Sequence, residues 1–209
     1  MRGFRFRQIR PGNPSQGKLT VYVGPMCSGK SDALITAIHL REGLGRSVQA
    51  FKPARDTRDG VPAIVSRTGR QFDATVLHRV TELSHHLKPG TDVVVLDEPH
   101  MMAVGFVQVV LDLINAGLEV LVAGLNLDFE GQPLAPMPEL LCYATTMVPL
   151  SASYCSRCRA PASYSHRRGS SLALILPGGE DAYEPLCPSC WLDTHGEQPA
   201  GEPPYTRST

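Results

Sequence analysis

The most constraining feature of this chain is a glycine-rich loop at residues 24–31 that directly follows an apolar run at residues 19–23. The loop satisfies the pattern G-x-x-x-x-G-K-[ST] of a phosphate-binding loop. In such loops backbone N–H groups turn toward an anion, the lysine faces the β- and γ-phosphates, and the last hydroxyl contacts Mg²⁺. A helical stretch follows, and its N-terminus favours phosphate. The candidate nucleotide-binding residues are therefore Gly24, Pro25, Met26, Cys27, Ser28, Gly29, Lys30 and Ser31.

A second apolar run, residues 93–96, ends in two acids. We expect Asp97 to hold the Mg²⁺ shell, usually through water, and Glu98 to project toward the γ-phosphate, where a nucleophile must be deprotonated or oriented. The alternative is that both acids cap the strand as solvated charges. His100 follows closely, and it either contacts nucleotide or substrate or merely continues the turn at Pro99.

Short β-branched runs alternate with helical stretches along the first 150 residues. This alternation predicts an α/β fold with a mainly parallel sheet of the phosphate-loop (RecA-like) type and helices on both faces. Catalytic groups are then expected at the carboxyl ends of the strands. The predicted elements are strands at 19–23, 47–51, 92–97 and 118–123, with helices at about 30–44 and 104–116.

Two cysteine pairs with C-x-x-C spacing predict a tetrahedral Zn²⁺ site, formed by Cys155, Cys158, Cys187 and Cys190. The intervening residues 159–186 exceed the roughly 15–20 residues of a compact zinc ribbon, so the metal is expected to close the base of a long loop. Such loops are usually lids or binding segments. Within this loop we expect stacking surface and closely approaching backbone for a flat ligand, from Tyr164, Ser165, Gly178, Gly179 and Tyr183. A purely structural zinc with a mobile loop, or two disulfides, are the alternatives.

Two further cysteines stand outside this set. Cys27 lies within the phosphate loop, where it is either a redox-sensitive thiol or simply a small residue at a variable position. We expect Cys142 to be a buried or half-buried thiol.

Changes in amino-acid composition divide the chain into four parts. Residues 1–17 and 196–209 are polar and rich in proline or glycine, so we expect both ends to be flexible. Residues 18–150 form the predicted nucleotide-binding domain. Residues 151–195, with cysteines, tyrosines and little helical periodicity, form the predicted zinc-binding domain.

Composition excludes several classes of protein. Twenty basic residues balance twenty acidic ones, so the chain lacks the positive charge of a protein that binds polymeric nucleic acid. No run approaches the length of a membrane span. The basic start at residues 1–7 is not followed by an apolar core, so no secretory signal is expected. Without such a signal, the six cysteines are better explained as metal ligands or reduced thiols than as disulfides. We therefore predict a cytoplasmic protein.

Six segments, taken in order and spacing, make residues 18–192 resemble the zinc-containing type of thymidine kinase. They are the phosphate loop, Lys52-Pro53-Ala54-Arg55-Asp56-Thr57-Arg58, Asp97-Glu98, Ala123-Gly124-Leu125-x-x-x-Phe129, Gly178-Gly179-Glu180-Asp181-x-Tyr183-Glu184 and the two cysteine pairs. The resemblance implies transfer of the γ-phosphoryl group of ATP to the 5′-hydroxyl of thymidine, with deoxyuridine as the other candidate substrate. It also implies nucleotide salvage for DNA synthesis and a homotetramer.

The resemblance further implies roles for individual residues. Glu98 would be the general base, and Asp56, Thr57 and Arg58 would lie near the phosphates. A zinc-anchored lasso would hold the base. The implied nucleoside contacts are Phe129, Leu174, Ile175, Leu176, Pro177, Gly178 and Tyr183, with Met26 and Leu125 as further walls.

The chain departs from the family pattern at five positions: Pro99, His100 and Met101 after the acidic pair, Asn126 after Gly-Leu, and Leu134 where an aromatic residue is usual. These departures bear on base preference and turnover. Two other functions are carried as alternatives. One is a nucleoside-independent ATPase with a zinc interaction module, and the other is a non-catalytic nucleotide-binding protein.

Overall fold

The computed structural model describes residues 17–58, 60–151, 153–169, 173, 178 and 182–196. The end segments predicted at 1–17 and 196–209 lie outside the described residues except for Gly17 and Gly196. The expected lasso contacts Leu174, Ile175, Leu176 and Pro177 also lie outside them.

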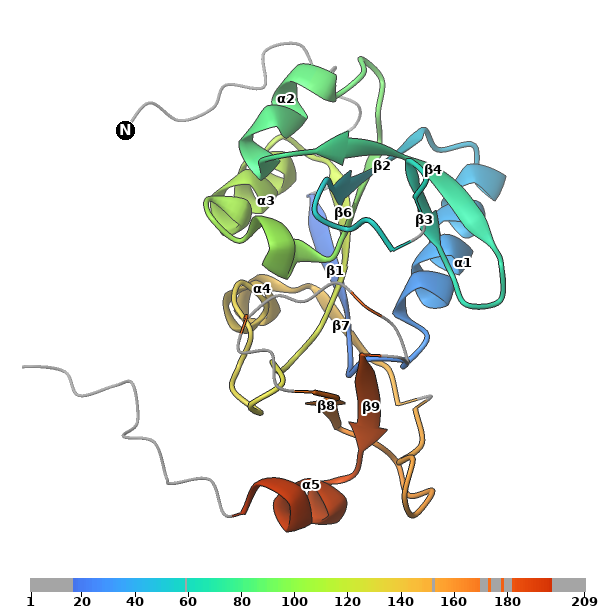
Figure 1. Cartoon of the computed structure of the whole chain (residues 1–209). Coiled ribbons are helices and arrows are strands. Elements are labelled where there is room, and N and C mark those ends of the chain that lie inside the picture. Colours follow the sequence, from blue (N-terminus) through green and yellow to red (C-terminus); the bar gives the residue numbers. More distant parts are fainter. Residues whose placement is uncertain are drawn as a thin grey trace, which may run out of the picture.

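A seven-stranded sheet forms the larger part of the molecule and confirms the predicted α/β class (Figure 1). Its order is β3-β4-β2-β5-β6-β1-β7, and every pairing is parallel except that of β3 with β4. The strands are β1 (Lys18–Val23), β2 (Val48–Pro53), β3 (Ala63–Val65), β4 (Gln71–Leu77), β5 (Val93–Asp97), β6 (Glu119–Gly124) and β7 (Thr146–Pro149).

Helices cover both faces of this sheet, as expected. On one face α1 (Lys30–Gly43) packs its buried Leu34, Ile35 and Ile38 against β1, β2, β5 and β6. The other face is covered by α2 (Leu83–His86), α3 (Phe106–Asn115) and α4 (Met137–Tyr143), and Figure 1 shows α1 on the opposite side of the sheet from α3 and α4. Two short 3₁₀ turns, η1 (Val80–Glu82) and η2 (Pro99–Met102), complete this domain.

The order of the strands places the predicted site residues at one edge. All residues of β5 and β6 are buried, which explains their continuous Val and Leu runs. The strands β2, β5, β6 and β1 are consecutive neighbours and run parallel, so the loops after their carboxyl ends converge. These loops carry Asp56 and Arg58, the acidic pair, the segment after Gly124, and the phosphate loop.

A smaller module follows the main sheet and lies beyond its carboxyl edge in Figure 1. The antiparallel strands β8 (Tyr164–Arg167) and β9 (Tyr183–Leu186) precede α5 (Pro188–His195). Its own core contains Cys155, Leu186, Cys187 and Trp191. The sequence did not predict the helix α5, which begins at a proline and has Cys187 as its N-cap.

Other expectations need correction in detail. The predicted helix at 104–116 begins only at Phe106, because Gly105 has a left-handed φ of 76°. The antiparallel edge strand β3, its neighbour β4 and the other edge strand β7 were not expected. Cys142 is exposed instead of buried or half-buried, since it lies on the outer side of α4. No helix of the described residues is both long and apolar enough to cross a membrane.

Candidate active site

The phosphate loop has the conformation that its glycines predict. Gly29, immediately before α1, has a φ of 83°, in the left-handed region that glycine tolerates best. Gly24 has no room for a side chain, because an added Cβ would lie 2.5 Å from the Leu150 carbonyl oxygen. The Lys30 ammonium group folds back over the loop and donates to the carbonyl oxygens of Gly24 at 3.3 Å and Pro25 at 2.6 Å. The loop is therefore preformed around a buried lysine.

A chain of four charged side chains runs from β2 to the acidic pair. The Lys52 ammonium, 2% exposed, lies 3.2 Å from one carboxylate oxygen of Asp56. Arg58 Nε donates to the other at 2.6 Å, and Arg58 Nη2 donates to Glu98 Oε1 at 2.7 Å. One oxygen of Glu98 is thereby fixed by a charge-assisted hydrogen bond.

The second oxygen of Glu98 is buried and has no hydrogen-bond partner among the described residues. Glu98 itself has φ 49° and ψ 57°, a left-handed conformation that is uncommon for a residue with a side chain. The turn directs the carboxylate away from the end of β5. His100 Nδ1 lies 3.5 Å from Glu98 Oε2, and both side chains are only 6% exposed.

The two neighbouring acids differ in their preferred charge. Burial and the adjacent negative charge of Glu98 raise the pKa of Asp97 to about 7. Burial would also raise the pKa of Glu98, but the positive charge of Arg58, assisted by His100 and Lys30, outweighs it and lowers that pKa. Glu98 is therefore ionised at neutral pH, the state required of a general base. A divalent cation beside Asp97 would favour its charged form as well.

A pocket of about 450 Å³ including its mouth opens next to Glu98. Apolar side chains make up most of the lining, with Arg58, Glu98, Asp128 and Arg167 as charged members. Its lining includes the expected residues Met26, Arg58, Glu98, His100, Leu125, Phe129, Gly178 and Tyr183, together with the departures Met101 and Leu134.

The structure adds a buried arginine to this pocket. The guanidinium carbon of Arg167 lies 3.7 Å from the centroid of the Phe129 ring, and Arg167 Nη2 donates to the Tyr183 hydroxyl at 2.9 Å. Arg167 Nη1 also donates to the carbonyl oxygen of Ala173. One side chain thus links the Phe129 loop to both β8 and β9.

Met26 belongs both to the phosphate loop and to the pocket wall. Its backbone is held from the small module on both sides: its N–H donates to Ser165 Oγ at 2.8 Å, and its carbonyl oxygen accepts from Ser153 Oγ at 2.9 Å. These two buried hydrogen bonds attach the small module directly to the phosphate loop.

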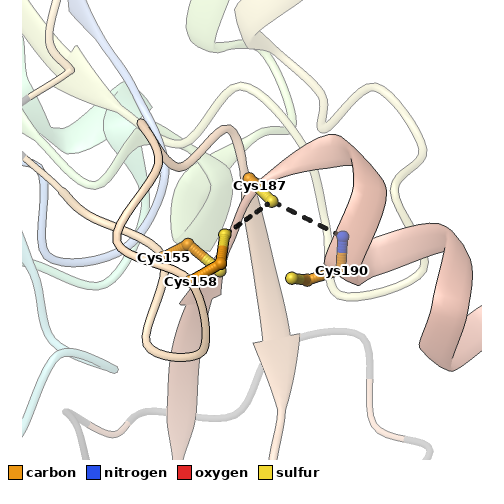
Figure 2. A group of neighbouring side chains, drawn as sticks. All are labelled: Cys155, Cys158, Cys187 and Cys190. Atoms are coloured by element: carbon orange, nitrogen blue, oxygen red, sulfur yellow. Dashed lines mark hydrogen bonds between the residues drawn. The ribbon is translucent and has the colours of Figure 1, made fainter.

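The four cysteines of the two pairs come together at the far side of this module (Figure 2). Their sulfur atoms all lie within 4.8 Å of one another, with Cys158 Sγ 3.5 Å from Cys187 Sγ. Four thiolates bound to Zn²⁺ at about 2.3 Å would be roughly 3.8 Å apart, so the cluster fits a tetrahedral zinc site. Burial would raise the pKa of Cys155, but nearby backbone N–H groups outweigh it and lower that pKa to about 6.

Comparison with known proteins agrees with this geometry. The pattern that defines the family "Thymidine kinase" matches residues 17–191. The chain belongs to the thymidine kinase family. It is 37% identical over 173 residues to a thymidine kinase of Bdellovibrio bacteriovorus, covering 83% of this chain and 84% of that protein.

Two further relatives carry the same name. A thymidine kinase of Bacteroides thetaiotaomicron is 34% identical over 182 residues, which cover 87% of this chain and 90% of the relative. One of Deinococcus deserti is 35% identical over 189 residues, covering 83% and 93%. The resemblance drawn from the motifs is thereby confirmed, and the four-cysteine cluster is consistent with the zinc-containing type.

Some expected site residues lie elsewhere than the pocket. Thr57 is exposed on the loop after β2. Tyr164 stacks on Trp191 in the core of the small module, with ring centroids 4.7 Å apart, so the expectation that it offers stacking surface to a ligand is wrong. Asn126 is not among the pocket residues, and its buried Oδ1 has no hydrogen-bond partner in the described chain. Cys27 Sγ accepts from Arg67 Nη2 at 2.6 Å.

The roles of Arg167, Ser153 and Lys52 were not predicted from the sequence. For Arg167, the strand pattern of the sequence contains a usable signal. Ser165 and Arg167 are two residues apart on β8, and the alternation of strand side chains places both on the buried face toward the pocket.

Proposed function

We propose that this chain transfers the γ-phosphoryl group of ATP to the 5′-hydroxyl of thymidine, with Glu98 as the general base. The observation that carries this proposal is Glu98 Oε2, a buried oxygen without a hydrogen-bond partner in the described chain, on a residue that lines the pocket. A nucleoside hydroxyl that enters the pocket can donate its proton to this oxygen, while Arg58 holds the other.

The proposed reaction needs little covalent chemistry from the protein, because phosphoryl transfer depends mainly on positioning and charge. The backbone N–H groups of the phosphate loop and the N-terminus of α1 would hold the β- and γ-phosphates. Lys30 would exchange its two carbonyl contacts for phosphate oxygens. Met26, which lines the pocket and belongs to the loop, keeps the two substrates adjacent.

Two metal ions have separate proposed roles. Mg²⁺ would neutralise phosphate charge, with Asp97 and Ser31 as the residues that hold it or its water shell. Zn²⁺ would be bound by the four cysteines and fix the base of the β8–β9 segment.

We also propose a homotetramer, on the basis of the resemblance to the zinc-containing thymidine kinases. Light scattering during gel filtration would test this assembly state.

The nucleoside would be held between the main domain and the small module. Phe129, Met101 and Leu134 offer apolar surface, while Tyr183 and Gly178 approach from the module side. We include residues 174–177 among the proposed contacts because the family resemblance places the lasso there. The pocket beside Glu98 favours this assignment over a nucleoside-independent ATPase, in which water alone would need to reach the base.

The deciding experiment is ATP consumption with a panel of nucleosides and without any. We expect thymidine-dependent formation of ADP, with deoxyuridine also accepted and purine nucleosides rejected. ATP hydrolysis that is equally fast without nucleoside would favour the ATPase, and ATP binding without any turnover would favour the non-catalytic alternative. Lys30→Ala serves as the control, since it should weaken both ATP binding and turnover.

A further inference from the structure

Two histidines of the small module lie together outside the four-cysteine cluster. His166 is in the middle of β8, and His195 is the last residue of α5. His166 Nδ1 lies 3.2 Å from His195 Nε2, and the ring planes are inclined at 74°. Neither side chain is used by the proposed phosphoryl transfer.

In each ring one nitrogen faces the other histidine and the second, outer nitrogen faces away from it. The neighbour of the outer nitrogen affects which of the two nitrogens carries the proton. His195 Nδ1 lies 3.1 Å from the Trp191 carbonyl oxygen, which can only accept a hydrogen bond, so Nδ1 carries the proton and Nε2 a lone pair. His166 Nε2 lies 4.0 Å from Glu184 Oε1, a charge contact that is too long for a hydrogen bond. The lone pair of His195 Nε2 therefore faces His166 Nδ1 at 3.2 Å. It can accept a hydrogen bond from His166 Nδ1, or both nitrogens can bind the same metal ion.

The distance suits a metal ion. Imidazole nitrogens bound at about 2.0–2.1 Å to a tetrahedral ion are roughly 3.3 Å apart, close to the separation of this pair. The outer nitrogens face a carboxylate and a backbone carbonyl, the partners that orient metal-binding histidines.

We propose that His166 and His195 form a second metal site, specific for a divalent transition ion that prefers imidazole, such as Zn²⁺, Ni²⁺ or Cu²⁺. In the described part of the chain, the four cysteines are the one group of three or more potential ligands. The histidine site therefore offers two protein ligands and leaves the remaining positions to water. The bound ion would join β8 to the end of α5, and β8 carries the pocket residues Ser165 and Arg167.

The protein contains an internal reporter for this site. Its single tryptophan, Trp191, stacks on His195 with ring centroids 3.7 Å apart and an interplanar angle of 12°. A paramagnetic ion bound to His195 would quench this fluorescence at short range. Ions bound to other histidines of the described surface would leave Trp191 largely unaffected.

The test is a titration of tag-free, zinc-loaded enzyme with Ni²⁺, followed by tryptophan fluorescence and calorimetry. We expect saturable quenching with about one equivalent of Ni²⁺, and at least about tenfold weaker binding in both His166→Gln and His195→Gln. His39→Gln is the matched control. His39 is an exposed histidine of α1, and its Nδ1 lies 3.1 Å from Glu42 Oε2, so it also has a carboxylate neighbour but is not part of the small module. This control should titrate like the native protein.

Zinc content and far-UV circular dichroism of both variants show whether the cysteine site and the module remain intact. With one zinc per chain retained, weaker Ni²⁺ binding supports the histidine site. Quenching that is linear and unsaturated in the native protein would overturn it. So would identical titrations of the native protein and both variants, since a hydrogen bond between the two rings would then account for their contact. Loss of thymidine kinase activity is not part of this readout, so the two proposals fail independently.

Discussion

Glu98 combines burial, a left-handed backbone and a fixed arginine partner, and each has a chemical consequence. The left-handed turn aims the carboxylate into the pocket, and Arg58 keeps it ionised. The cost of this arrangement is backbone strain of roughly 1–3 kcal/mol, which the surrounding structure must offset. Such strain at a pocket is typical of functional positions.

We predict that Glu98→Gln lowers kcat for thymidine by about 10²–10⁴-fold, because the amide cannot accept the proton of the 5′-hydroxyl. ATP affinity should stay unchanged, since the phosphate loop is untouched. Glu139→Gln, at an exposed position of α4, is the matched control and should retain native turnover. Retention of more than about a tenth of native kcat by the Glu98 variant, where chemistry limits the rate, would exclude Glu98 as the base.

Met101 and Leu134 are departures from the family pattern, and both line the pocket. Flexible or smaller apolar side chains discriminate between bases less strictly than rigid rings do. We predict that Met101→Phe or Leu134→Phe raises the ratio of kcat/KM for thymidine over deoxyuridine, within the roughly 1–3 kcal/mol that one methyl group allows. The ratio is measured for each variant beside the native enzyme. No increase in either variant would show that these positions do not set base selectivity.

At the scale of elements, we expect the β8–β9 segment to depend on a metal bound by the four cysteines. We predict one zinc per chain in the native protein. We also predict that Cys158→Ser reduces bound zinc and weakens nucleoside binding more than ATP binding. The reason is that the module supplies Tyr183 and Gly178 to the pocket, whereas most of the phosphate loop belongs to the main domain. Calorimetry with each ligand and elemental analysis provide the measurements.

Cys142→Ser is the control for this substitution, because Cys142 is exposed and lies outside the cluster. Equal losses for both ligands in the Cys158 variant would instead mean that zinc supports the whole fold. Some loss of ATP affinity is consistent with the prediction, since Ser153 and Ser165 join the module to Met26 of the phosphate loop.

The elements differ in how well sequence predicts them, and the reason is physical. Strands β1, β5 and β6 are buried on both faces, so their apolar runs are continuous and visible. Strand β4 and the edge strand β7 are partly exposed and carry weak patterns. The short helix α5 is held by cysteines at its start, so helical periodicity gives little signal there.

The residues of the candidate site also differ in how well the sequence predicts them. Lys30, Asp97, Glu98 and the cysteines follow from local motifs with fixed spacing. The contact of Arg167 with Phe129 joins strand β8 to a loop of the main domain. The Lys52–Asp56 pair gains its meaning only from Arg58 and Glu98, which continue the chain of charges. Tertiary packing alone reveals such partners.

At the scale of the whole molecule, buried carboxylates paired with cations lie at both ends of the parallel strands. The amino-terminal edge holds Glu119, whose side chain is 2% exposed and paired with Lys18, Arg41 and Arg46. Burial would raise the pKa of Glu119, but hydrogen bonding and charge from Arg41, with help from the other two cations, outweigh burial and lower it.

We predict that Glu119→Gln lowers the free energy of unfolding by about 1–3 kcal/mol at pH 7, with little change in KM. A carboxylate with a depressed pKa contributes its stability above the unfolded value near 4.3 and loses it as pH falls through the folded value. The difference between native protein and variant should therefore shrink below about pH 4.3. Urea titrations across this range measure it, and a difference that does not change with pH would contradict the assignment.

The unequal covering of the sheet has a dynamic consequence. In the described chain, one face is shielded by α1 alone among the helices, and the first turn of α1 is the end of the phosphate loop. Bound ATP would therefore anchor the helix that shields this face, while the apolar cluster that α3 and α4 form on the other face contains no phosphate-loop residue. Ligand binding raises the cost of every opening that releases the ligand. Amide hydrogens of α1 and of the strand residues beneath it should exchange with deuterium much more slowly when ATP is bound, whereas those of α3 should change little.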